Sequence, residues 1–335
     1  MKSLFLAAAL ALAAVSCKED PNPVAPAVNR PETLSVTEEA LATPKEIIIC
    51  DQKNARIIMV DVANGNAITW EWKANASYAM IHTTAQSWFS NLSEAKLVYN
   101  GNYILATASG GGVALINVSS KKAIWFDYAG GNTHSAELLP NGNIVTASST
   151  GGYLKIFVTD SYINDASDQT GPIAFPDVHN VVWDHARQQL YAAGKNIIRV
   201  YSYNNSCRSP ALTLKKTWTM PQGNAHDLFP VHGSTTDLWL TNSGYIYKFN
   251  VVTGAFTLQK TLTAVKSVTS GPSGYATILA RATGVGGETW RTDQVIDINN
   301  ALVYKNTSIG LYKARWRLVN LFSYPAGDSF HECTH

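Results

Sequence analysis

The chain has 335 residues, which is enough for one large domain or two ordinary ones. It is 46% hydrophobic and 15% charged, with a formal net charge of +2, so it is globular and poor in charge. Nucleic acids and anionic membrane surfaces attract proteins with a concentrated basic stripe, and because this sequence has none, we expect no nucleic-acid partner.

Residues 1–16 have the pattern of an export signal, a lysine at position 2 followed by an apolar run that ends in small residues. The run is too short for a permanent membrane helix. Ala14-Val15-Ser16-Cys17 resembles a bacterial lipobox, in which the cysteine is lipidated and becomes the first residue, although such sequences favour Leu where Ala14 stands. The alternative is ordinary cleavage after Ala11-Leu12-Ala13, which leaves Cys17 as a free thiol.

Residues 17–45 are rich in Pro, Ala, Thr and Glu and too poor in apolar residues to fold, so they are predicted to form a flexible tether. Lys18-Glu19-Asp20 resembles the surface-export signal of some Gram-negative lipoproteins, and a solvated linker is the alternative. We therefore expect a protein anchored by lipid to the outer membrane, on its periplasmic face or at the cell surface.

From Glu46 onward the chain is a succession of short β-rich runs separated by Asn, Gly and Asp turns. Residues 94–118 (EAKLVYNGNYILATASGGGVALINV) align without a gap on the matching part of residues 133–158, at an offset of 41 residues (142 − 101 = 41). Later units open at spacings of 45, 47 and 40 residues (179 − 134 = 45, 226 − 179 = 47, 266 − 226 = 40). Such a period is typical of four-stranded propeller blades.

The first unit, from Glu46 to Lys73, lacks an opening strand, while Leu311–Phe322 is a strand without a turn partner. Together they can close a ring and remove its exposed sheet edges. The sequence therefore predicts an all-β, six-bladed β-propeller over residues 46–322, with the first blade closed by the C-terminal strand and a tail over 323–335. We expect it to be a monomer.

This arrangement resembles the six-bladed propellers called TolB-like, and more closely an uncharacterised family of secreted bacterial propeller proteins. The closer resemblance rests on Cys50-Asp51-Gln52-Lys53, on His134-Ser135-Ala136-Glu137-Leu138-Leu139-Pro140 and on Ala225-His226-Asp227. It covers essentially all of residues 46–322. It implies a fold, but the family has no assigned activity to carry over.

Candidate site residues come from the openings of the predicted inner strands, which lie beside the central channel in a propeller. His134, His179, His226 and Lys266 hold equivalent positions in four successive blades, and Arg315 is expected near them on the closing strand. Three imidazoles with two cations can bind an anionic ligand, perform acid–base chemistry or hold a divalent metal. Because no close-spaced ligand motif fixes a metal geometry, no metal ligands are assigned.

The long connection from Ala74 to Ser93 is predicted to form a lid or rim at the same channel mouth, because long loops in compact folds are usually functional. His82 and Trp88 on this connection are further candidate ligand-binding residues, and an exposed Trp88 would suit stacking on a sugar ring. After Cys17, the remaining cysteines are Cys50, Cys207 and Cys333, so at most one intrachain disulfide can form. Its presence stays open, and the tail is expected to be mobile.

Three functions remain open from the sequence. The first is a binding module whose channel mouth captures an extracellular glycan or protein. The second is a histidine- or metal-dependent lyase or hydrolase acting on an acidic carbohydrate or a related substrate. No Gly-x-Ser-x-Gly motif or close acid pair supports a serine hydrolase or a retaining glycosidase. The third is a scaffold with a plugged channel.

Overall fold

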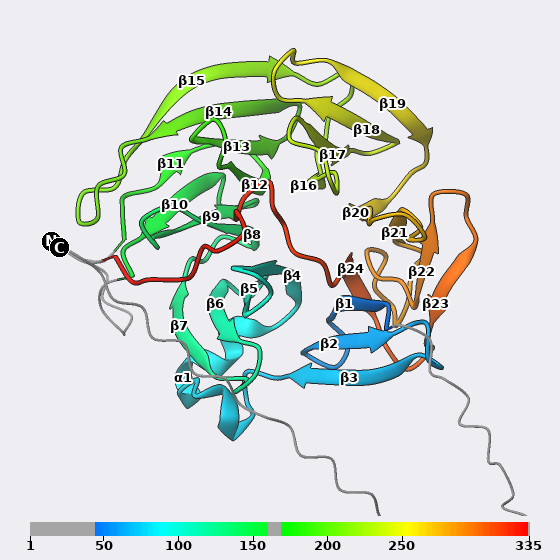
Figure 1. The fold of residues 1–335 in the computed structure, drawn as a ribbon. Coiled ribbons are helices and arrows are strands. Elements are labelled where there is room, and N and C mark those ends of the chain that lie inside the picture. Colours follow the sequence, from blue (N-terminus) through cyan, green and yellow to red (C-terminus); the bar gives the residue numbers. More distant parts are fainter. Residues whose placement is uncertain (1–43, 160–168, 334–335) are drawn as a thin grey trace, which may run out of the picture. The chain divides into compact units, whose positions relative to one another are not determined.

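The computed structural model describes residues 44–159 and 169–333 of the chain. The predicted export signal, the lipidation site at Cys17 and nearly all of the predicted tether lie outside these residues. The described residues form six antiparallel sheets of four strands each, arranged as blades around a common centre (Figure 1). The all-β, six-bladed prediction is therefore confirmed.

Within each blade the strands follow one another from the channel outward. Blade one consists of β24 (Leu311–Trp316), β1 (Glu46–Asp51), β2 (Arg56–Asp61) and β3 (Ala67–Trp72). Blade two consists of β4 (Leu92–Val98), β5 (Tyr103–Ala108), β6 (Gly112–Asn117) and β7 (Ala123–Tyr128). Blade three consists of β8 (Thr133–Leu138), β9 (Ile144–Ser148), β10 (Tyr153–Phe157) and β11 (Ile173–Ala174). Blade four consists of β12 (Val178–Asp184), β13 (Gln189–Gly194), β14 (Ile197–Tyr203) and β15 (Leu212–Thr219). Blade five consists of β16 (Asp227–Pro230), β17 (Asp237–Thr241), β18 (Tyr245–Asn250) and β19 (Phe256–Thr261). Blade six consists of β20 (Val265–Thr269), β21 (Ile278–Arg281), β22 (Gln294–Asp297) and β23 (Leu302–Lys305).

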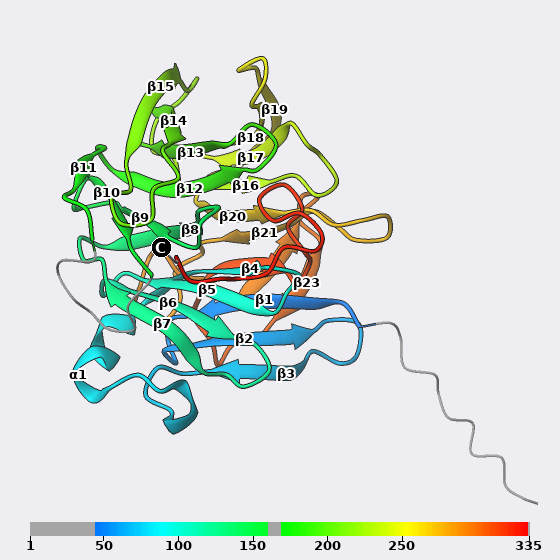
Figure 2. The ribbon, with the colours of Figure 1, turned by 60° about the vertical axis from the view of Figure 1, so that its left-hand side comes forward.

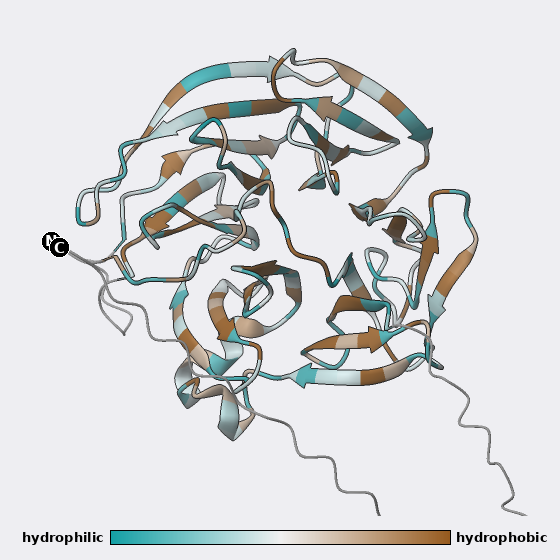
Figure 3. Ribbon diagram, viewed as in Figure 1, coloured by the Kyte–Doolittle hydropathy of each residue, from teal (hydrophilic) through white to brown (hydrophobic). Residues whose placement is uncertain are grey.

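Burial follows the position of a strand within its blade. Every residue of β4, β8 and β12 is buried, because both faces of an innermost strand pack against neighbouring blades. The outermost strand β15 has five exposed residues in succession and is mostly pale or teal in Figure 3. Apolar residues of the inner and middle strands therefore form the core between blades.

The ring closes through its two chain ends. Strand β24 pairs antiparallel with β1, with Ile48 opposite Arg315 and Ile49 opposite Ala314. The lone C-terminal strand thus supplies the innermost strand of the first blade, as the missing strand of that unit predicted. Closure protects the inner strands from pairing with another chain.

The connection between β3 and β4 contains three short helices, η1 (Ser77–Ala79), α1 (Thr83–Gln86) and η2 (Ser87–Phe89). Figures 1 and 2 both show α1 at the outer edge of blade two beside β7. Ala79, Ala85 and Phe89 bury their side chains in the apolar core around Trp72, so this part of the connection does not form the lid or rim expected at the channel mouth. Within residues 44–159 and 169–333, no helix has the length and apolar content needed to cross a membrane.

The C-terminal segment 317–333 packs across the ring, in contrast to the mobile tail expected (Figure 1, red). Tyr324 is buried and donates a hydrogen bond to Glu137 near the end of β8, and Cys333 forms a disulfide with Cys207, with Cα atoms 5.5 Å apart. The segment therefore lies at the channel end where the innermost strands finish. Cys50 is a buried free thiol.

A glycine in blade three accommodates this segment. Gly142 turns the chain between β8 and β9 with φ of +88°, where glycine is favoured, and its N–H donates to the Leu139 carbonyl at 2.9 Å. A Cβ atom at this position would also collide with the carbonyl oxygen of His331. The Asn141-Gly142 turn seen in the sequence therefore serves both the hairpin and the docking of the C-terminal segment.

Candidate functional site

A cavity of about 380 Å³ lies at the channel end where the innermost strands begin. We call it the histidine cavity. Its lining residues come from all six blades and include no carboxylate among the residues that the structure describes: Gln52, Asn91, Ser109, Asn132, His134, His179, His226, Lys266, Trp290 and Tyr312.

Two of the three histidines and the lysine reach this cavity through a shared backbone irregularity. The ladders of β8, β12 and β20 each shift by one residue at their first positions, at His134, His179 and Lys266. Such bulges re-aim a side chain and are frequent next to functional sites. His226 directly precedes β16, and its N–H donates to the Thr241 carbonyl at 2.9 Å.

The imidazoles are in mutual contact. The ring centroids of His134 and His179 are 4.6 Å apart in a stacked arrangement, and those of His179 and His226 are 5.1 Å apart at a right angle. Tyr312 packs against His134 with centroids 5.6 Å apart. The convergence predicted for His134, His179 and His226 is therefore present in the structure.

Burial keeps these histidines neutral. Burial is the largest cause that lowers the pKa of His226 to about 2, and the positive charges of Lys266 and Lys313 add to it. The pKa values of His134 and His179 are lowered for the same reason, although for His179 the Asp177 carbonyl, 2.9 Å from Nδ1, and the Asp177 carboxylate, 3.5 Å from Nδ1, partly oppose the effect. Their neutral rings offer hydrogen bonds to a ligand without carrying charge. Nδ1 of His134 and Nδ1 of His226 are buried without a hydrogen-bond partner in the described residues.

Lys266 supplies the only charge in the cavity lining, as far as the described residues form it. Its Nζ lies 3.3 Å from His226 Nε2 and 5.9 Å from the centroid of the Tyr312 ring. Burial, and then repulsion from Lys313, lowers the pKa of Lys266 to about 8. At neutral pH the cavity therefore contains an ammonium group, and none of the other lining residues that the structure describes has a carboxylate.

The rim beside β24 is held by a network that links blades one, two and six. Gln52 Oε1 accepts hydrogen bonds from Trp290 Nε1 and from Arg291 Nε, both at 3.1 Å, and Arg291 also donates to Asn91 Oδ1 at 2.9 Å. The Trp290 side chain remains 40% exposed. An indole fixed at its N–H edge and open to solvent provides a flat surface for stacking.

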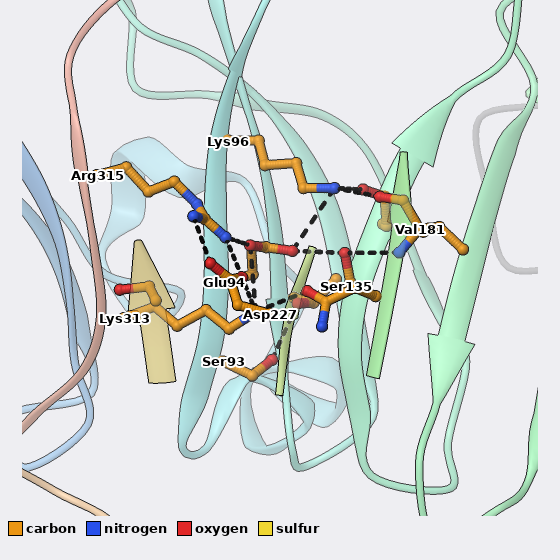
Figure 4. Close-up of polar contacts among 12 residues, drawn as sticks. Ser93, Glu94, Lys96, Ser135, Val181, Asp227, Lys313 and Arg315 are labelled. Carbon is orange, nitrogen blue, oxygen red and sulfur yellow. Dashed lines mark hydrogen bonds and ion pairs between the residues drawn. The ribbon is translucent and has the colours of Figure 1, made fainter. Parts of the chain in front are cut away.

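Directly below the cavity lies a ring of polar residues, and all of them except Glu94 directly follow a cavity-lining residue in the chain; Figure 4 shows part of this ring. Lys313 Nζ contacts Asn180 Oδ1 at 2.9 Å, Asp227 Oδ1 at 3.2 Å and Glu94 Oε1 at 3.3 Å. The six members are Glu94, Ser135, Asn180, Asp227, Ser267 and Lys313. All are buried, so they close the channel beneath the cavity.

Arg315 belongs to this buried layer rather than to the cavity. Its guanidinium donates to Asp227 Oδ1 at 2.6 Å and also to Glu94, and it covers the Phe229 ring at 3.8 Å from the centroid. Although burial alone would lower its pKa, the two carboxylates raise it, so Arg315 stays charged. Tyr312 takes the place at the mouth that was expected for Arg315.

A second ion pair lies further down the channel. Lys96 Nζ contacts Glu137 Oε2 at 3.2 Å and the carbonyls of Ala136 and Val181 at 3.0 and 2.7 Å. Burial raises the pKa of Glu137 to about 7 despite the lysine. These residues connect the plug of the channel to Tyr324 of the C-terminal segment.

His82 and Trp88 lie away from the histidine cavity. His82 packs against Phe126, and Trp88 against Tyr128, with ring centroids 5.2 Å apart in both pairs. Both partners belong to the outermost strand β7. The structure therefore does not bring these two candidates together with the histidines, and of the described residues in their connection only Asn91 lines the cavity.

The cavity residues that the sequence analysis missed had a weak signal. Asn132, Asp177 and Asn224 stand two positions before His134, His179 and His226. Asn91 stands two positions before Ser93, the equivalent residue of blade two. All four have positive φ, from 52° to 61°. This recurrence marks the start of each inner strand and would have identified the residues beside it. Trp290 has no such marker, because it reaches the rim from the long connection between β21 and β22.

No group of three or more His, Cys, Asp or Glu side chains in residues 44–159 and 169–333 is arranged to hold a metal ion. The histidine rings contact one another by their faces and edges. The arrangement is suited to binding a polar ligand through neutral donors, one cation and an aromatic surface.

Comparisons with known proteins give the family and the fold. No curated protein matches the chain. A protein of unknown function from Bacteroides caccae has a similar structure, with a TM-score of 0.50 at 10% identity over 82% of this chain and 99% of that one. Two further structures match with lower TM-scores. Dihydro-heme d1 dehydrogenase NirN in complex with DHE has 0.44 at 12% identity, and Kuenenia stuttgartiensis hydrazine synthase has 0.45 at 8%.

This chain spans about half of the NirN chain, covering 53% of it with 78% of its own length, and the hydrazine synthase match covers 62% of this chain and 63% of that one. At 10% identity, the match to the Bacteroides caccae protein bears on the fold alone. The family model described as "Family of unknown function (DUF6528)" matches residues 1–332. The chain therefore belongs to this family of unknown function.

Proposed function

We propose that this protein is an exported lipoprotein that binds an acidic carbohydrate in the histidine cavity. The observation that carries the proposal is the composition of the cavity lining, in which one ammonium group lies among neutral imidazoles and amides, with no carboxylate among the described lining residues. An anionic group entering there would pair with Lys266 in a site that is already partly desolvated, where charge interactions are stronger than in water.

The neutral part of the lining favours a sugar acid over a bare inorganic anion. Amides from Gln52, Asn91 and Asn132 provide donors and acceptors for hydroxyl groups, and the exposed face of Trp290 offers a surface for a pyranose ring. A cavity of about 380 Å³ lies within the size range of small-ligand sites. It cannot enclose a folded protein partner.

Binding is preferred over a histidine-dependent lyase or hydrolase. A general base is most effective when its pKa lies near the working pH. The pKa of His226 is lowered to about 2, and those of His134 and His179 are also lowered, so the histidines hold a proton poorly. Hydrogen bonding to a ligand requires no such proton uptake.

The export and anchoring of the protein are part of the proposal. The disulfide between Cys207 and Cys333 supports an oxidising compartment outside the cytoplasm. Lipid attachment at Cys17, a tether over 17–45 and a position at the outer membrane, facing the periplasm or the cell surface, complete it. Labelling with radioactive palmitate tests the anchor, and label retained in a Cys17→Ala variant would disprove it. The likeness to TolB-like propellers stays a prediction.

Calorimetric titration tests the ligand class. Galacturonate oligosaccharides are expected to bind the wild-type protein, while matched neutral galactose oligosaccharides bind at least tenfold more weakly. Lys266→Met should remove this preference, and Trp290→Ala should weaken both ligands because the stacking surface is lost. Equal binding of acidic and neutral oligosaccharides, or binding unchanged in Lys266→Met, would overturn the proposal.

A further inference from the structure

Lys266 is partly buried and differs from Lys96 and Lys313, two fully buried lysines near the channel. Lys96 contacts Glu137 at 3.2 Å, and Lys313 contacts Asp227 at 3.2 Å and Glu94 at 3.3 Å, so both ammonium groups are paired with carboxylates. Among the described residues, Lys266 contacts the neutral His226 nitrogen at 3.3 Å and the face of Tyr312. Its amine also opens into a cavity that can hold a small molecule.

We propose that Lys266 is a nucleophilic amine that forms an imine with the carbonyl carbon of a 2-oxo acid, such as an acidic sugar in its open-chain keto form. This inference rests on the proposed function, because the same cavity must hold the acid. It adds a covalent bond between Lys266 and the ligand, and this bond requires a carbonyl group in the ligand. Binding alone requires neither.

The surroundings of Lys266 supply what the step requires. The lowered pKa of Lys266 leaves a share of the side chain as free amine at neutral pH, and lysines desolvated beside another cation are activated in this way. His226 Nε2 accepts a hydrogen bond from Nζ and so fixes its position at the cavity wall. The charged and titratable groups around Lys266 are Lys313 below, the phenol of Tyr312, the three neutral histidines and, beyond them, the Asp177 carboxylate, which lies 3.5 Å from His179 Nδ1.

The atoms of the step balance without an added reagent. The amine nitrogen attacks the carbonyl carbon, the C–N bond forms, and one N–H proton moves to the carbonyl oxygen to give a carbinolamine. The hydroxyl group then leaves with the second N–H proton as water, and the C=N bond forms. Burial raises the pKa of Tyr312, so its phenol stays protonated and can donate to the departing hydroxyl. The neighbouring carboxylate of a 2-oxo acid would accept hydrogen bonds from the amide of Asn132 and from the imidazoles.

Reductive trapping tests the inference. The full chain is incubated with pyruvate and sodium borohydride at pH 7.5, digested and analysed by mass spectrometry. A reduced pyruvate adduct is expected on Lys266 at a yield at least tenfold above that on any solvent-exposed lysine such as Lys216. The paired lysines Lys96 and Lys313 are internal controls and should carry none. No adduct on Lys266, or a yield equal to that on exposed lysines, would overturn the inference.

Lys266→Arg is the matched variant, because it keeps the cation and removes the nucleophilic amine. It should trap no pyruvate, while the wild-type protein should bind the methyl glycoside of galacturonate, a sugar acid that cannot open to a carbonyl form. If the wild-type protein binds this glycoside and traps no pyruvate, the imine is wrong while the proposed function stands. If it traps pyruvate at Lys266 and does not bind the glycoside, the proposed carbohydrate function is wrong.

Discussion

Replacing Lys266 by methionine should make the protein more stable, because a partly buried ammonium without a carboxylate partner is unfavourable for folding. The pKa of Lys266 falls from the ordinary lysine value of 10.5 to about 8 on folding. At about 1.4 kcal/mol for each pKa unit, the charged side chain costs about 3 kcal/mol of folding free energy at pH 7. The hydrogen bond to His226 offsets part of this cost, so a gain of about 2–3 kcal/mol is expected for Lys266→Met.

The pH dependence of this gain follows from the sign of the shift. Between pH 8 and pH 10.5 the unfolded chain holds the lysine proton and the folded protein does not, so wild-type stability rises with pH in this window. The advantage of Lys266→Met should therefore be complete below pH 8 and mostly lost by pH 10. A lysine kept at such a cost to stability is typical of a functional site.

Guanidinium unfolding at pH 7 and pH 10 provides the assay, with the difference between variant and wild type as the readout. Lys248→Met is the control, because Lys248 lies outside the cavity and its Nζ is 5.1 Å from the centroid of the Trp239 ring. It should change stability by less than about 1 kcal/mol at both pH values. A Lys266→Met protein less stable than wild type at pH 7, or a difference that is the same at both pH values, would refute the reasoning.

Three further predictions concern the ligand, the C-terminal segment and the buried plug. Affinity for an acidic sugar, measured by calorimetry, should fall roughly tenfold per pH unit above pH 8 as Lys266 loses its proton, and a flat profile would contradict this. Replacing Cys207 and Cys333 together by serine should lower the free energy of unfolding by about 2–5 kcal/mol, because the disulfide closes a loop with a sequence separation of 126; unchanged denaturant midpoints would argue against it. Asp227→Asn should cost about 3–5 kcal/mol in the same assay, because it leaves Lys313 and Arg315 short of a counter-charge, and a loss below 1 kcal/mol would contradict that role.

The ring could be predicted from the sequence because its information is local and repeated. Each blade needs a tight turn between its first two strands. In blade three the Asn141-Gly142 pair predicts this turn, because glycine readily adopts the positive φ that the turn requires. The incomplete first unit and the unpaired strand Leu311–Phe322 then determine the closure. The equivalent positions of His134, His179 and Lys266 follow from the same repeat, which is why the sequence alone predicts that the histidines converge.

The features that sequence reasoning missed depend on contacts between distant parts of the chain. Trp290 reaches the cavity through a hydrogen bond to Gln52, a partner 238 residues away. The C-terminal segment docks through Tyr324 and through a disulfide whose pairing no local pattern specifies. The aromatic residues of the connection with Trp88 suggested a place at the channel mouth. Aromatic content does not specify which surface a segment packs against, and here Trp88 packs against Tyr128 on the outside of blade two.

The error over Arg315 shows how strand register decides which residue meets a ligand. Tyr312 and Arg315 lie on the same strand, and three residues of extended chain span about 10 Å. The repeat places the mouth residue directly before Lys313, as His226 directly precedes Asp227, so the aligned residue is Tyr312. Arg315 instead reaches the acids of the buried layer, where it neutralises Asp227 and Glu94 together with Lys313. Because those acids are fully engaged below the cavity, Lys266 is left without a counter-charge, and this imbalance is what a ligand anion would relieve.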